Sequence, residues 1–420
     1  MPNKSPKIAV ILFPGTNCEL ETVAALKRNG FAPEVLRWNE KKSLKNFAGV
    51  VIPGGFSYED RGRSGLIASR DPMMQEIFAV AKRGGVVLGI CNGAQVLVES
   101  GIVPNFEFGK SPLALTYNRR VKNGKVMGSG FYNAWVNLKA NTARANAFNQ
   151  FPEDTILHVP VAHGEGRFYT EDADLIQKLV DNGQNAFLYV NANGELDPTF
   201  PTNPNASILN LAGVTNPAGN VMALMPHPER CAAGDVIFAS IYKWITGKVK
   251  KPKAPKFVVK LPVSKILPKP KVNVELFVSL IITDNEALSV GAAAKLNLLK
   301  YRYFGLDFTG DESALEKIIR SGDLLNPEKE AVVAKINGKT LRFDKKKGWI
   351  ETEFQLPENK ALAVLRDASG DIAKAKSLPE MKALRSGMLW VSSDAKKADF
   401  EKAVKGGFFH HPAASDLMAI

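Results

Sequence analysis

The feature that most restricts the fold of this chain is a cysteine between two glycines, where an apolar run gives way to a helical pattern. Val86–Leu88 predicts a buried strand and Ala94–Glu99 predicts a helix. Gly89 and Gly93, on either side of Cys91, permit the sharp, strained strand-to-helix turn that presents the nucleophile of many hydrolases. Strands that lead directly into helices are typical of α/β proteins. The alternative is a structural cysteine buried in a glycine-rich turn.

A second motif, far downstream, has the groups that a cysteine nucleophile needs. A base must lie within hydrogen-bond reach of the thiol, and the base needs an acceptor that orients it. Pro226 and Pro228 hold this loop out of a helix. His227 and Glu229 are two residues apart, so their side chains point the same way from an extended backbone. A lone histidine is more often structural, but this spacing predicts a catalytic base with its orienting acid.

Both motifs resemble those of class I glutamine amidotransferases, whose glutaminase triad is Cys, His and Glu. Within that family, the sequence is similar to the glutaminase components of phosphoribosylformylglycinamidine synthases, which serve de novo purine synthesis. The resemblance covers about residues 7–246, and its motifs come in the family's order. The further motifs that carry it are Lys7–Glu19, Pro53–Tyr58, Val161–Phe168 and Asn203–Ser207.

The resemblance implies a mechanism and a set of site residues. Cys91 would attack glutamine, His227 would accept the thiol proton, and Glu229 would orient the imidazole. Backbone N–H groups near Gly55 and Asn92 would hold the oxyanion. The expected substrate-binding residues are Gly54, Gly55, Phe56, Asn92, Gln95, His163 and Glu165.

The chain departs from the family pattern in one loop near this site. Where the family often has Ser-Tyr-Gly-Asp, residues 57–60 are Ser-Tyr-Glu-Asp, with Glu59 in the place of glycine. The change falls in the loop expected to carry the oxyanion-hole backbone, so the conformation of that loop stays open. Gly54 and Gly55 are present, and we therefore still expect close approach of the backbone to a substrate.

Cofactor motifs are absent from the sequence. It contains no CxxC pair, no HExxH motif and no Walker A motif, so we expect no metal site and no cofactor in this chain. The resemblance implies that ammonia passes to a separate large synthetase subunit, which would use ATP and Mg²⁺. No such synthetase domain is evident in the sequence. We therefore expect the large subunit to be an obligate partner, with glutamine as the substrate.

Much of the formal net charge of +13 comes from one segment. Lys248–Lys271 contains nine lysines, five prolines and no acidic residue, which is typical of an extended, self-repelling linker. The alternative is a nucleic-acid-binding tail, but the segment lacks the interleaved aromatic residues expected of single-strand binders. We therefore predict a linker over residues 247–272 and consider nucleic acid an unlikely partner.

Cysteine usage and hydropathy indicate the compartment. Three widely spaced cysteines give no disulfide framework, and no apolar run is long enough to span a membrane. Met1–Ser5 shows no secretory leader pattern. We therefore expect a cytoplasmic protein with no membrane partner.

The order of predicted elements over residues 1–246 defines the first domain. Short apolar runs alternate with helical patterns, which predicts βαβ units and a doubly wound, mostly parallel sheet. Phe151–Val214 is turn-rich and β-like. The predicted strands are residues 8–13, 49–52, 86–90 and 221–225, and the predicted helices are residues 19–29, 72–83 and 236–245.

Residues 273–420 predict a smaller α+β module. Strands over 274–280 and 300–308 alternate with helices over 286–300 and 313–321, an order that suggests a ferredoxin-like unit. The pattern repeats at an offset of 85 residues, from Leu315 to Phe400 and from Pro327 to Pro412. We therefore predict a tandem duplication of β-α-β-α halves, with coincidence of short helices as the alternative. His410 and His411 are expected to be surface polar residues.

This C-terminal module resembles, more weakly, the small accessory subunit of the same synthases, which in that family bridges the glutaminase to the large subunit. Leu324–Pro327 is the best local match, and residues 339–355 match nothing that we recognise. Two other functions remain as alternatives to a glutaminase fused to an adaptor. One is a cysteine hydrolase or chaperone-like protein of the same fold, and the other is a non-catalytic scaffold.

Overall fold

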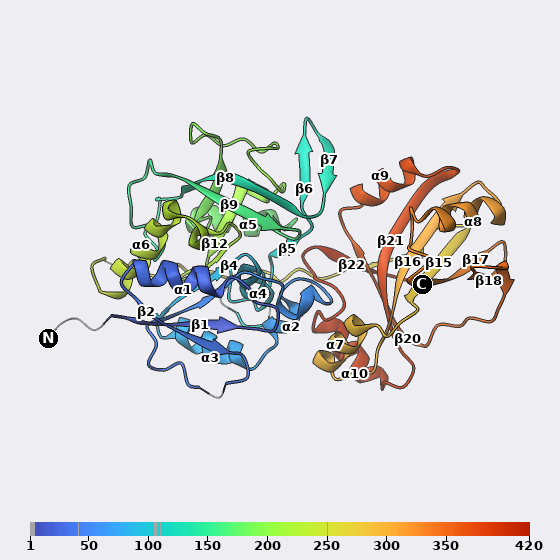
Figure 1. The fold of residues 1–420 in the computed structure, drawn as a ribbon, viewed down its shortest axis with the longest axis horizontal. Coiled ribbons are helices and arrows are strands. Elements are labelled where there is room, and N and C mark those ends of the chain that lie inside the picture. The colour runs from blue at the N-terminus through green and yellow to red at the C-terminus, as the bar shows by residue number, and fades with distance from the viewer. Residues whose placement is uncertain (1–4, 41, 105–106, 110, 250) are drawn as a thin grey trace. The chain divides into compact units, whose positions relative to one another are not determined.

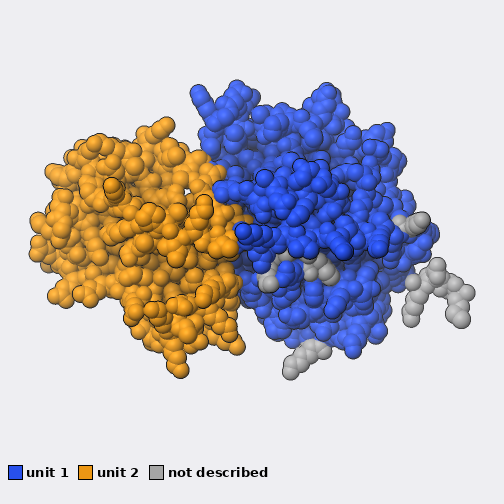
Figure 2. All heavy atoms as spheres, turned by 180° about the vertical axis from the view of Figure 1, so that it is seen from behind, with its two compact units in different colours: residues 1–262 blue, residues 263–420 orange. Residues whose placement is uncertain are grey.

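The computed structural model describes residues 5–40, 42–104, 107–109, 111–249 and 251–420. Of the segment 1–5, for which no leader pattern was predicted, only Ser5 lies within the described residues. The chain forms two compact units, residues 1–262 and 263–420, each with its own sheet and core (Figures 1 and 2). None of the helices in the described ranges has both the length and the apolar character needed to cross a membrane.

A nine-stranded sheet forms the centre of the first unit. Its first five strands pair in parallel, and the remaining four extend it with antiparallel pairings. In sheet order the strands are β2 (Ala32–Arg37), β1 (Lys7–Leu12), β3 (Gly49–Ile52), β4 (Val86–Ile90), β13 (Val221–Leu224), β12 (Leu211–Thr215), β11 (Phe187–Val190), β8 (Tyr132–Ala140) and β9 (Ile156–His163).

Helices cover both faces of the parallel strands. Figure 1 shows α1 (Glu19–Arg28) and α6 (Asp235–Ile245) on one side of the sheet and α3 (Met73–Lys82) on the other. The two helices on the first side are joined by the Arg28–Asp235 ion pair at 2.8 Å. Every residue of β3 and β4 is buried, as expected for strands covered on both faces. The doubly wound α/β fold predicted from the sequence is therefore confirmed.

The antiparallel half of the sheet comes mostly from the turn-rich, β-like part of the sequence. Two short antiparallel pairs accompany it: β5 (Ala114–Thr116) pairs with the distant β10 (Arg167–Tyr169), and β6 (Arg119–Lys122) forms a hairpin with β7 (Lys125–Ser129). The helix α5 (Ala173–Asp181) follows β10 and is capped by the Asp172 side chain. This half matters for function because β9 ends at His163, next to the loop that carries Glu165.

The second unit has its own nine-stranded sheet, with four helices. In sheet order the strands are β14 (Ile266–Leu267), β22 (Ser415–Met418), β20 (Asn359–Leu365), β21 (Met381–Ser392), β16 (Leu299–Phe308), β15 (Val274–Leu280), β17 (Glu330–Ile336), β18 (Lys339–Asp344) and β19 (Gly348–Glu351). The helices are α7 (Asn285–Ala294), α8 (Glu312–Ser321), α9 (Ser369–Ser377) and α10 (Lys397–Lys405).

The two halves of this unit repeat one pattern about the central pair of strands β16 and β21. The first half runs β15, α7, β16, α8, β17, and the second runs β20, α9, β21, α10, β22. Both place their strands in the same order, with the first strand of each half, β15 or β20, between the other two and antiparallel to both. The sequence repeat aligns α8 with α10. Each half therefore contains the predicted β-α-β-α order plus one further strand.

Three details of the second unit differ from the sequence-based expectations. The helix predicted to reach Lys300 ends at Ala294, because Lys295 takes a left-handed conformation with φ of +58°. The unmatched residues 339–355 form the β18–β19 hairpin, which extends the sheet beyond β17. The prediction that His410 and His411 are surface residues is wrong: both are buried, and His411 Nδ1 accepts a hydrogen bond from the Ala413 amide.

The described part of the lysine- and proline-rich segment is mostly without helix or strand, and it is attached to both units in turn. Phe257 and Val259 pack against the core of the first unit, and Lys178 Nζ donates a hydrogen bond to Val258 O at 2.8 Å. Further along, β14 pairs in parallel with β22. The Lys265 amide also donates a hydrogen bond to Asp416 Oδ1 at 2.9 Å. The boundary between the units thus falls inside the segment predicted as a linker over residues 247–272.

We predict that the chain can be divided after Pro262 into two pieces that each fold. Residues 263–420 retain β14, whereas the matched piece 273–420 loses its pairing with β22 and the Lys265–Asp416 hydrogen bond. Loss of about 1–2 kcal/mol of net hydrogen bonding should lower the melting temperature by about 4 °C. Thermal unfolding followed by circular dichroism measures the difference. Equal melting temperatures would mean that β14 contributes nothing to the second unit.

Candidate active site

Cys91 lies in a strained turn between β4 and α4 (Asn92–Glu99). Its φ and ψ are +50° and −105°, a backbone conformation that residues with a Cβ rarely adopt. The Cys91 amide donates a hydrogen bond to Leu224 O at 2.8 Å, which fixes the turn to the end of β13. A Cβ added to Gly93 would lie 2.0 Å from Ile52 O, and one added to Gly89 would lie 2.3 Å from Gly93 O. Both glycines are therefore needed for this turn to close.

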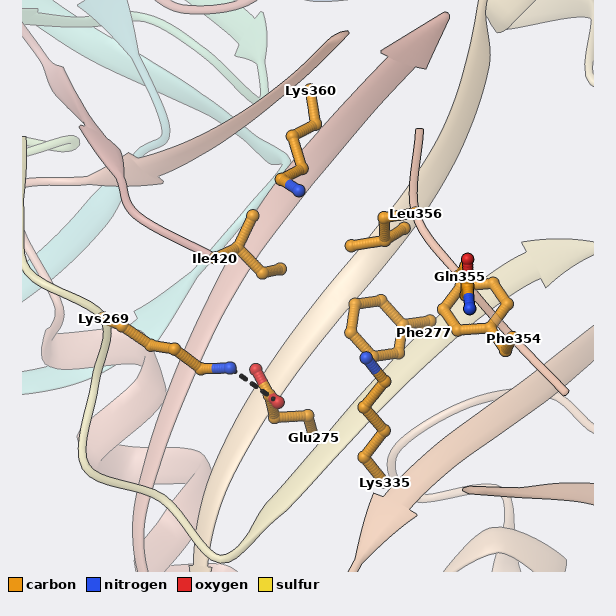
Figure 3. Close-up of a pocket in the computed structure, with 9 residues that line it drawn as sticks. All are labelled: Lys269, Glu275, Phe277, Lys335, Phe354, Gln355, Leu356, Lys360 and Ile420. Carbon is orange, nitrogen blue, oxygen red and sulfur yellow. Dashed lines mark hydrogen bonds and ion pairs between the residues drawn. The ribbon is translucent and has the colours of Figure 1, made fainter. Parts of the chain in front are cut away.

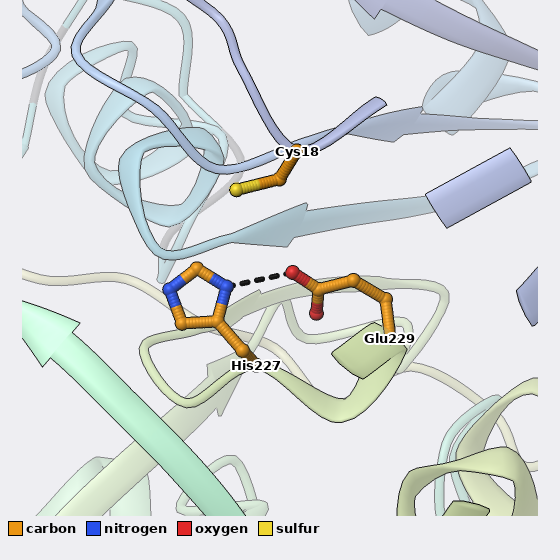
Figure 4. Close-up of side chains that lie close together, drawn as sticks. All are labelled: Cys18, His227 and Glu229. Carbon is orange, nitrogen blue, oxygen red and sulfur yellow. Dashed lines mark hydrogen bonds and ion pairs between the residues drawn. The ribbon is translucent and has the colours of Figure 1, made fainter. Parts of the chain in front are cut away.

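His227 and Glu229 follow β13 and form a buried pair (Figure 4). Glu229 Oε1 lies 2.6 Å from His227 Nδ1. The His227 amide donates to Pro160 O at 2.9 Å, which anchors the loop to β9. Burial lowers the pKa of His227, but the charges of Cys91 and Glu229 outweigh it and raise that pKa well above its ordinary value. A proton is therefore held on His227 beside Cys91, where it can be passed to a leaving group.

Gly54 brings the catalytic side chains to one place. A Cβ added there would lie 2.8 Å from His227 Cε1 and 3.4 Å from Cys91 Cβ. The same Cβ would lie 3.1 Å from the sulfur of a second cysteine, Cys18. Glycine at this position therefore leaves the space in which the nucleophile and its base meet.

Cys18 is a part of this site for which the sequence suggested no role. It directly precedes α1, and Figure 4 shows its side chain directed toward His227 and Glu229. Potential ligand atoms of these three residues all lie within 4.8 Å of one another. Arg230 donates a hydrogen bond to Cys18 Sγ at 3.0 Å. The contact joins residues that are 212 positions apart, so no local sequence pattern could have revealed it.

The predicted substrate-binding residues Asn92, Gln95 and Glu165 form one hydrogen-bonded network beside Cys91. Asn92 Nδ2 donates to Gln95 Oε1 at 3.0 Å, and Gln95 Nε2 donates to Glu165 O at 2.7 Å. Asn92 Nδ2 also lies 3.2 Å from Asp60 Oδ1. Asp60 belongs to the altered loop at residues 57–60. It was not among the site residues predicted from the sequence.

Asp60 and Glu165 are partly buried acids whose pKa values are strongly raised. Burial raises the pKa of Asp60 to about 6. Burial, and then the nearby charge of Asp60, raise the pKa of Glu165 to about 7. The amide of Ser64 donates to Glu165 Oε2 at 3.4 Å. Two carboxyl groups held this way are suited to receive a positively charged group of a ligand, whose charge would favour their ionised forms.

Two other predicted substrate-binding residues, His163 and Phe56, have hydrogen-bond partners outside this network. His163 is buried with its Nδ1 3.1 Å from Asn118 Nδ2, and burial together with the charge of His227 lowers its pKa to about 3. It is therefore neutral at physiological pH. The Phe56 amide donates to Gly15 O at 2.9 Å, so this N–H is engaged within the protein, while the Phe56 side chain is 46% exposed.

Backbone donors remain at the turn itself. Ala94 and Gln95 donate their amides to Cys91 O, whereas Asn92 is the first residue of α4, where backbone N–H groups have no partner within the helix.

The altered loop contains three successive residues in the left-handed conformation, Tyr58, Glu59 and Asp60, with φ of +52°, +57° and +54°. Glu59 thus takes the conformation that glycine adopts without strain.

A separate hollow lies within the second unit (Figure 3). Its lining combines lysines with aromatic rings. Lys269 pairs with Glu275 at 3.0 Å, and Lys335 Nζ lies 5.6 Å from the centre of the Phe277 ring. The lining residues are Lys269, Glu275, Phe277, Lys335, Phe354, Gln355, Leu356, Lys360 and Ile420.

Comparison with known proteins identifies the family. A model of the CobB/CobQ-like glutamine amidotransferase domain matches residues 5–246. The chain belongs to this family. It is therefore a glutamine amidotransferase, and the hydrolase, chaperone and scaffold alternatives are not favoured. The matched residues include Cys91, His227 and Glu229 and end before the lysine-rich segment.

Relatives and a solved structure match the same part of the chain. Phosphoribosylformylglycinamidine synthase subunit PurQ of Methanothrix thermoacetophila is 45% identical over 228 residues, which are 53% of this chain and 86% of the relative. The PurQ subunit of Pyrococcus furiosus is 38% identical over 246 residues, 57% of this chain and 98% of the relative. A chain of the Thermotoga maritima PurLQS structure is 31% identical, with a TM-score of 0.45, and covers 57% of this chain and 99% of that chain.

We predict that the strain at Cys91 reduces stability in a measurable way. Cys91→Gly and Cys91→Ala both remove the thiol, but only glycine adopts φ of +50° without a steric cost. Strain of about 1–3 kcal/mol, less the larger entropy loss of glycine, should make Cys91→Gly more stable than Cys91→Ala by about 1 kcal/mol. Chemical denaturation measures the free energy of unfolding of both variants. A more stable alanine variant would show that the turn is unstrained.

Proposed function

We propose that this chain is the glutaminase of a phosphoribosylformylglycinamidine synthase, fused to an adaptor module for the large synthetase subunit. One observation carries the proposal: Cys91 at a strained turn faces the buried His227–Glu229 pair across Gly54. The names of the relatives supply the pathway, since both are subunits of this synthase.

The first chemical step uses the three triad residues. The Cys91 sulfur attacks the side-chain amide carbon of glutamine after its proton passes to His227. His227 then delivers this proton to the departing ammonia. Glu229, 2.6 Å from Nδ1, holds the imidazole in one orientation and stabilises its charged form. Water then hydrolyses the thioester to glutamate, with His227 as the base.

The oxyanion formed in this step needs donors at the turn. The backbone N–H of Asn92, at the start of α4, and the backbone near Gly55 are the groups that we assign to it. One such donor is typically worth about 3–4 kcal/mol of transition-state stabilisation. Gly54 and Gly55 allow the backbone to approach the substrate closely enough for these contacts.

The α-ammonium group of glutamine is assigned to the two partly buried acids, Asp60 and Glu165. Asp60 and Glu165 lie in the network that starts at Asn92, one residue from the nucleophile. A substrate ammonium would compensate the cost of burying their negative charge, which otherwise keeps their pKa values raised. Gln95 holds the Glu165 loop in place through its hydrogen bond to Glu165 O.

The ammonia released by this reaction needs a partner subunit that uses it. Ammonia would be consumed by a large subunit that uses ATP and Mg²⁺, and we assign neither of these to the present chain. No membrane or nucleic-acid partner is part of this proposal, and the cytoplasm is the compartment that we expect. The lysine-rich segment acts as a tether, since each of its ends is attached to a different unit.

We assign the adaptor role to the second unit because of its internal repeat. Its two halves place their strands in the same order about β16 and β21, as two copies of one small subunit would in a dimer. The outer edges are closed by the β18–β19 hairpin at one end and by β14 at the other. One chain would thus supply both halves of an accessory pair.

We expect Cys91→Ala to abolish glutamine-dependent synthesis by the assembled complex while leaving ammonia-dependent synthesis largely intact. Cys91 serves only the release of ammonia, so added ammonium should bypass its loss. Product formation is measured with glutamine and with ammonium as nitrogen source. Cys231→Ala, which removes a thiol outside the triad, is the control and should retain both activities. Equal loss of both activities in Cys91→Ala would identify Cys91 as structural and contradict the proposal.

We also expect glutamine to bind more weakly as the pH falls. The pKa values of Asp60 and Glu165 are about 6 and about 7, so both lose negative charge as the pH falls below these values. The KM for glutamine should therefore rise below about pH 7. Asp60→Asn should raise KM about tenfold or more, as expected for a charge-assisted hydrogen bond of about 1.5–3 kcal/mol.

The control for this prediction is Asp154→Asn, which changes an exposed acid by the same isosteric replacement. Ammonia release at several pH values on both sides of the two pKa values measures KM for each variant. If Asp60→Asn kept the wild-type KM and pH dependence, the assignment of the ammonium site would be wrong, although the triad would be unaffected.

A further inference from the structure

The mechanism above gives no task to Cys18, although its sulfur lies among the catalytic groups. Cys18 is 1% exposed, and its sulfur would lie 3.1 Å from a Cβ at Gly54, the same point that His227 and Cys91 approach. Among the described residues, Cys18, His227 and Glu229 form a group whose potential ligand atoms all lie within 4.8 Å of one another. A thiol, an imidazole and a carboxylate at this spacing are a donor set for a metal ion.

One atom of the group, Glu229 Oε2, is buried and has no hydrogen-bond partner in the described part of the chain. The side chain of Glu229 is fully buried. His227 bonds Glu229 through Nδ1 and has the thiols of Cys18 and Cys91 as further hydrogen-bonding neighbours. A buried polar atom without a partner is costly, and a bound ion would remove that cost for Glu229 Oε2.

We propose that Cys18, His227 and Glu229 form an inhibitory site for Zn²⁺ or a similar soft divalent cation. Zinc takes sulfur, nitrogen and oxygen ligands at about 2.0–2.3 Å in a tetrahedral arrangement, in which ligand atoms lie roughly 3.3–3.8 Å apart. Ligand atoms within 4.8 Å reach this spacing by small side-chain rotations. Cys91 lies outside this group, so we expect water in the fourth position.

Binding of the ion would stop the reaction at its first step. An ion on Nε2 of His227 would occupy the nitrogen that serves Cys91. An ion on Nδ1 would break the contact with Glu229 and fix the ring proton on Nε2, which could then no longer accept the proton of Cys91. Either way the enzyme would be inhibited reversibly, and a chelator would restore it.

In the metal-free protein, the guanidinium of Arg230 occupies the side of Cys18 where a cation would bind. Its guanidinium lies 3.0 Å from Cys18 Sγ and must withdraw before a cation binds. Its side chain is 31% exposed, so it can turn toward solvent.

The test uses the full chain with the nucleophile removed. In Cys91→Ala, one Cd²⁺ per chain should bind with the ultraviolet absorption of a cadmium–thiolate bond, and Zn²⁺ should displace it. Adding Cys18→Ala should abolish the band, whereas adding Cys231→Ala should leave it. No band in Cys91→Ala, or a band that survives loss of Cys18, would overturn the proposal. Failure of the proposed glutaminase activity would not affect this measurement.

A second measurement covers the case in which the Cys18 variant does not fold. Glu229→Gln in the Cys91→Ala background retains the shape of the side chain and removes a charged ligand. It should weaken Cd²⁺ binding at least about tenfold, the usual cost of disturbing a metal site. In the intact enzyme, Zn²⁺ should inhibit ammonia release, and Cys18→Ala should need at least about ten times more Zn²⁺ for the same fractional inhibition. Unchanged Cd²⁺ affinity or unchanged Zn²⁺ sensitivity would contradict the site.

Discussion

The active site depends on close packing of backbone segments at glycines, which have no side chain to keep the segments apart. At Gly54, a Cβ would lie 2.8 Å from the imidazole of His227, and at Gly93 a Cβ would lie 2.0 Å from Ile52 O. These contacts bring the end of β3, the Cys91 turn and the loop after β13 to one point. A side chain at either glycine would separate the nucleophile from its base. The arrangement of parallel strands supplies the frame, since ligand sites lie at the carboxyl ends of such strands.

Much of the first unit follows from local sequence patterns. The strands at 49–52 and 86–90 were predicted with the bounds that the structure has, because short, fully apolar runs bounded by glycine have few other uses in a soluble α/β protein. The turn at Cys91 follows from its two glycines. In the second unit, the repeat at 85 residues predicted the duplication, but the helix after β15 was predicted too long. Alanine-rich composition does not reveal the left-handed residue Lys295 that ends it.

The remaining site residues could not be predicted because they depend on distant contacts. Cys18 meets Arg230 across 212 positions, and Asp60 meets Asn92 across 32. Neither pairing has a local signature. No local pattern shows that the charge of Asp60 acts on Glu165, or that His410 and His411 are buried. Such features arise only when the sheet brings separate loops together.

The central claim is that Cys91 is the glutamine nucleophile, although a second thiol, Cys18, lies beside it. Labelling with a diazo-ketone analogue of glutamine, followed by peptide mass analysis, tests this most directly. The account predicts one adduct, on the peptide containing Cys91, that excess glutamine prevents. An adduct on Cys18 or Cys231 in place of Cys91, or labelling of Cys91 that glutamine does not reduce, would contradict it.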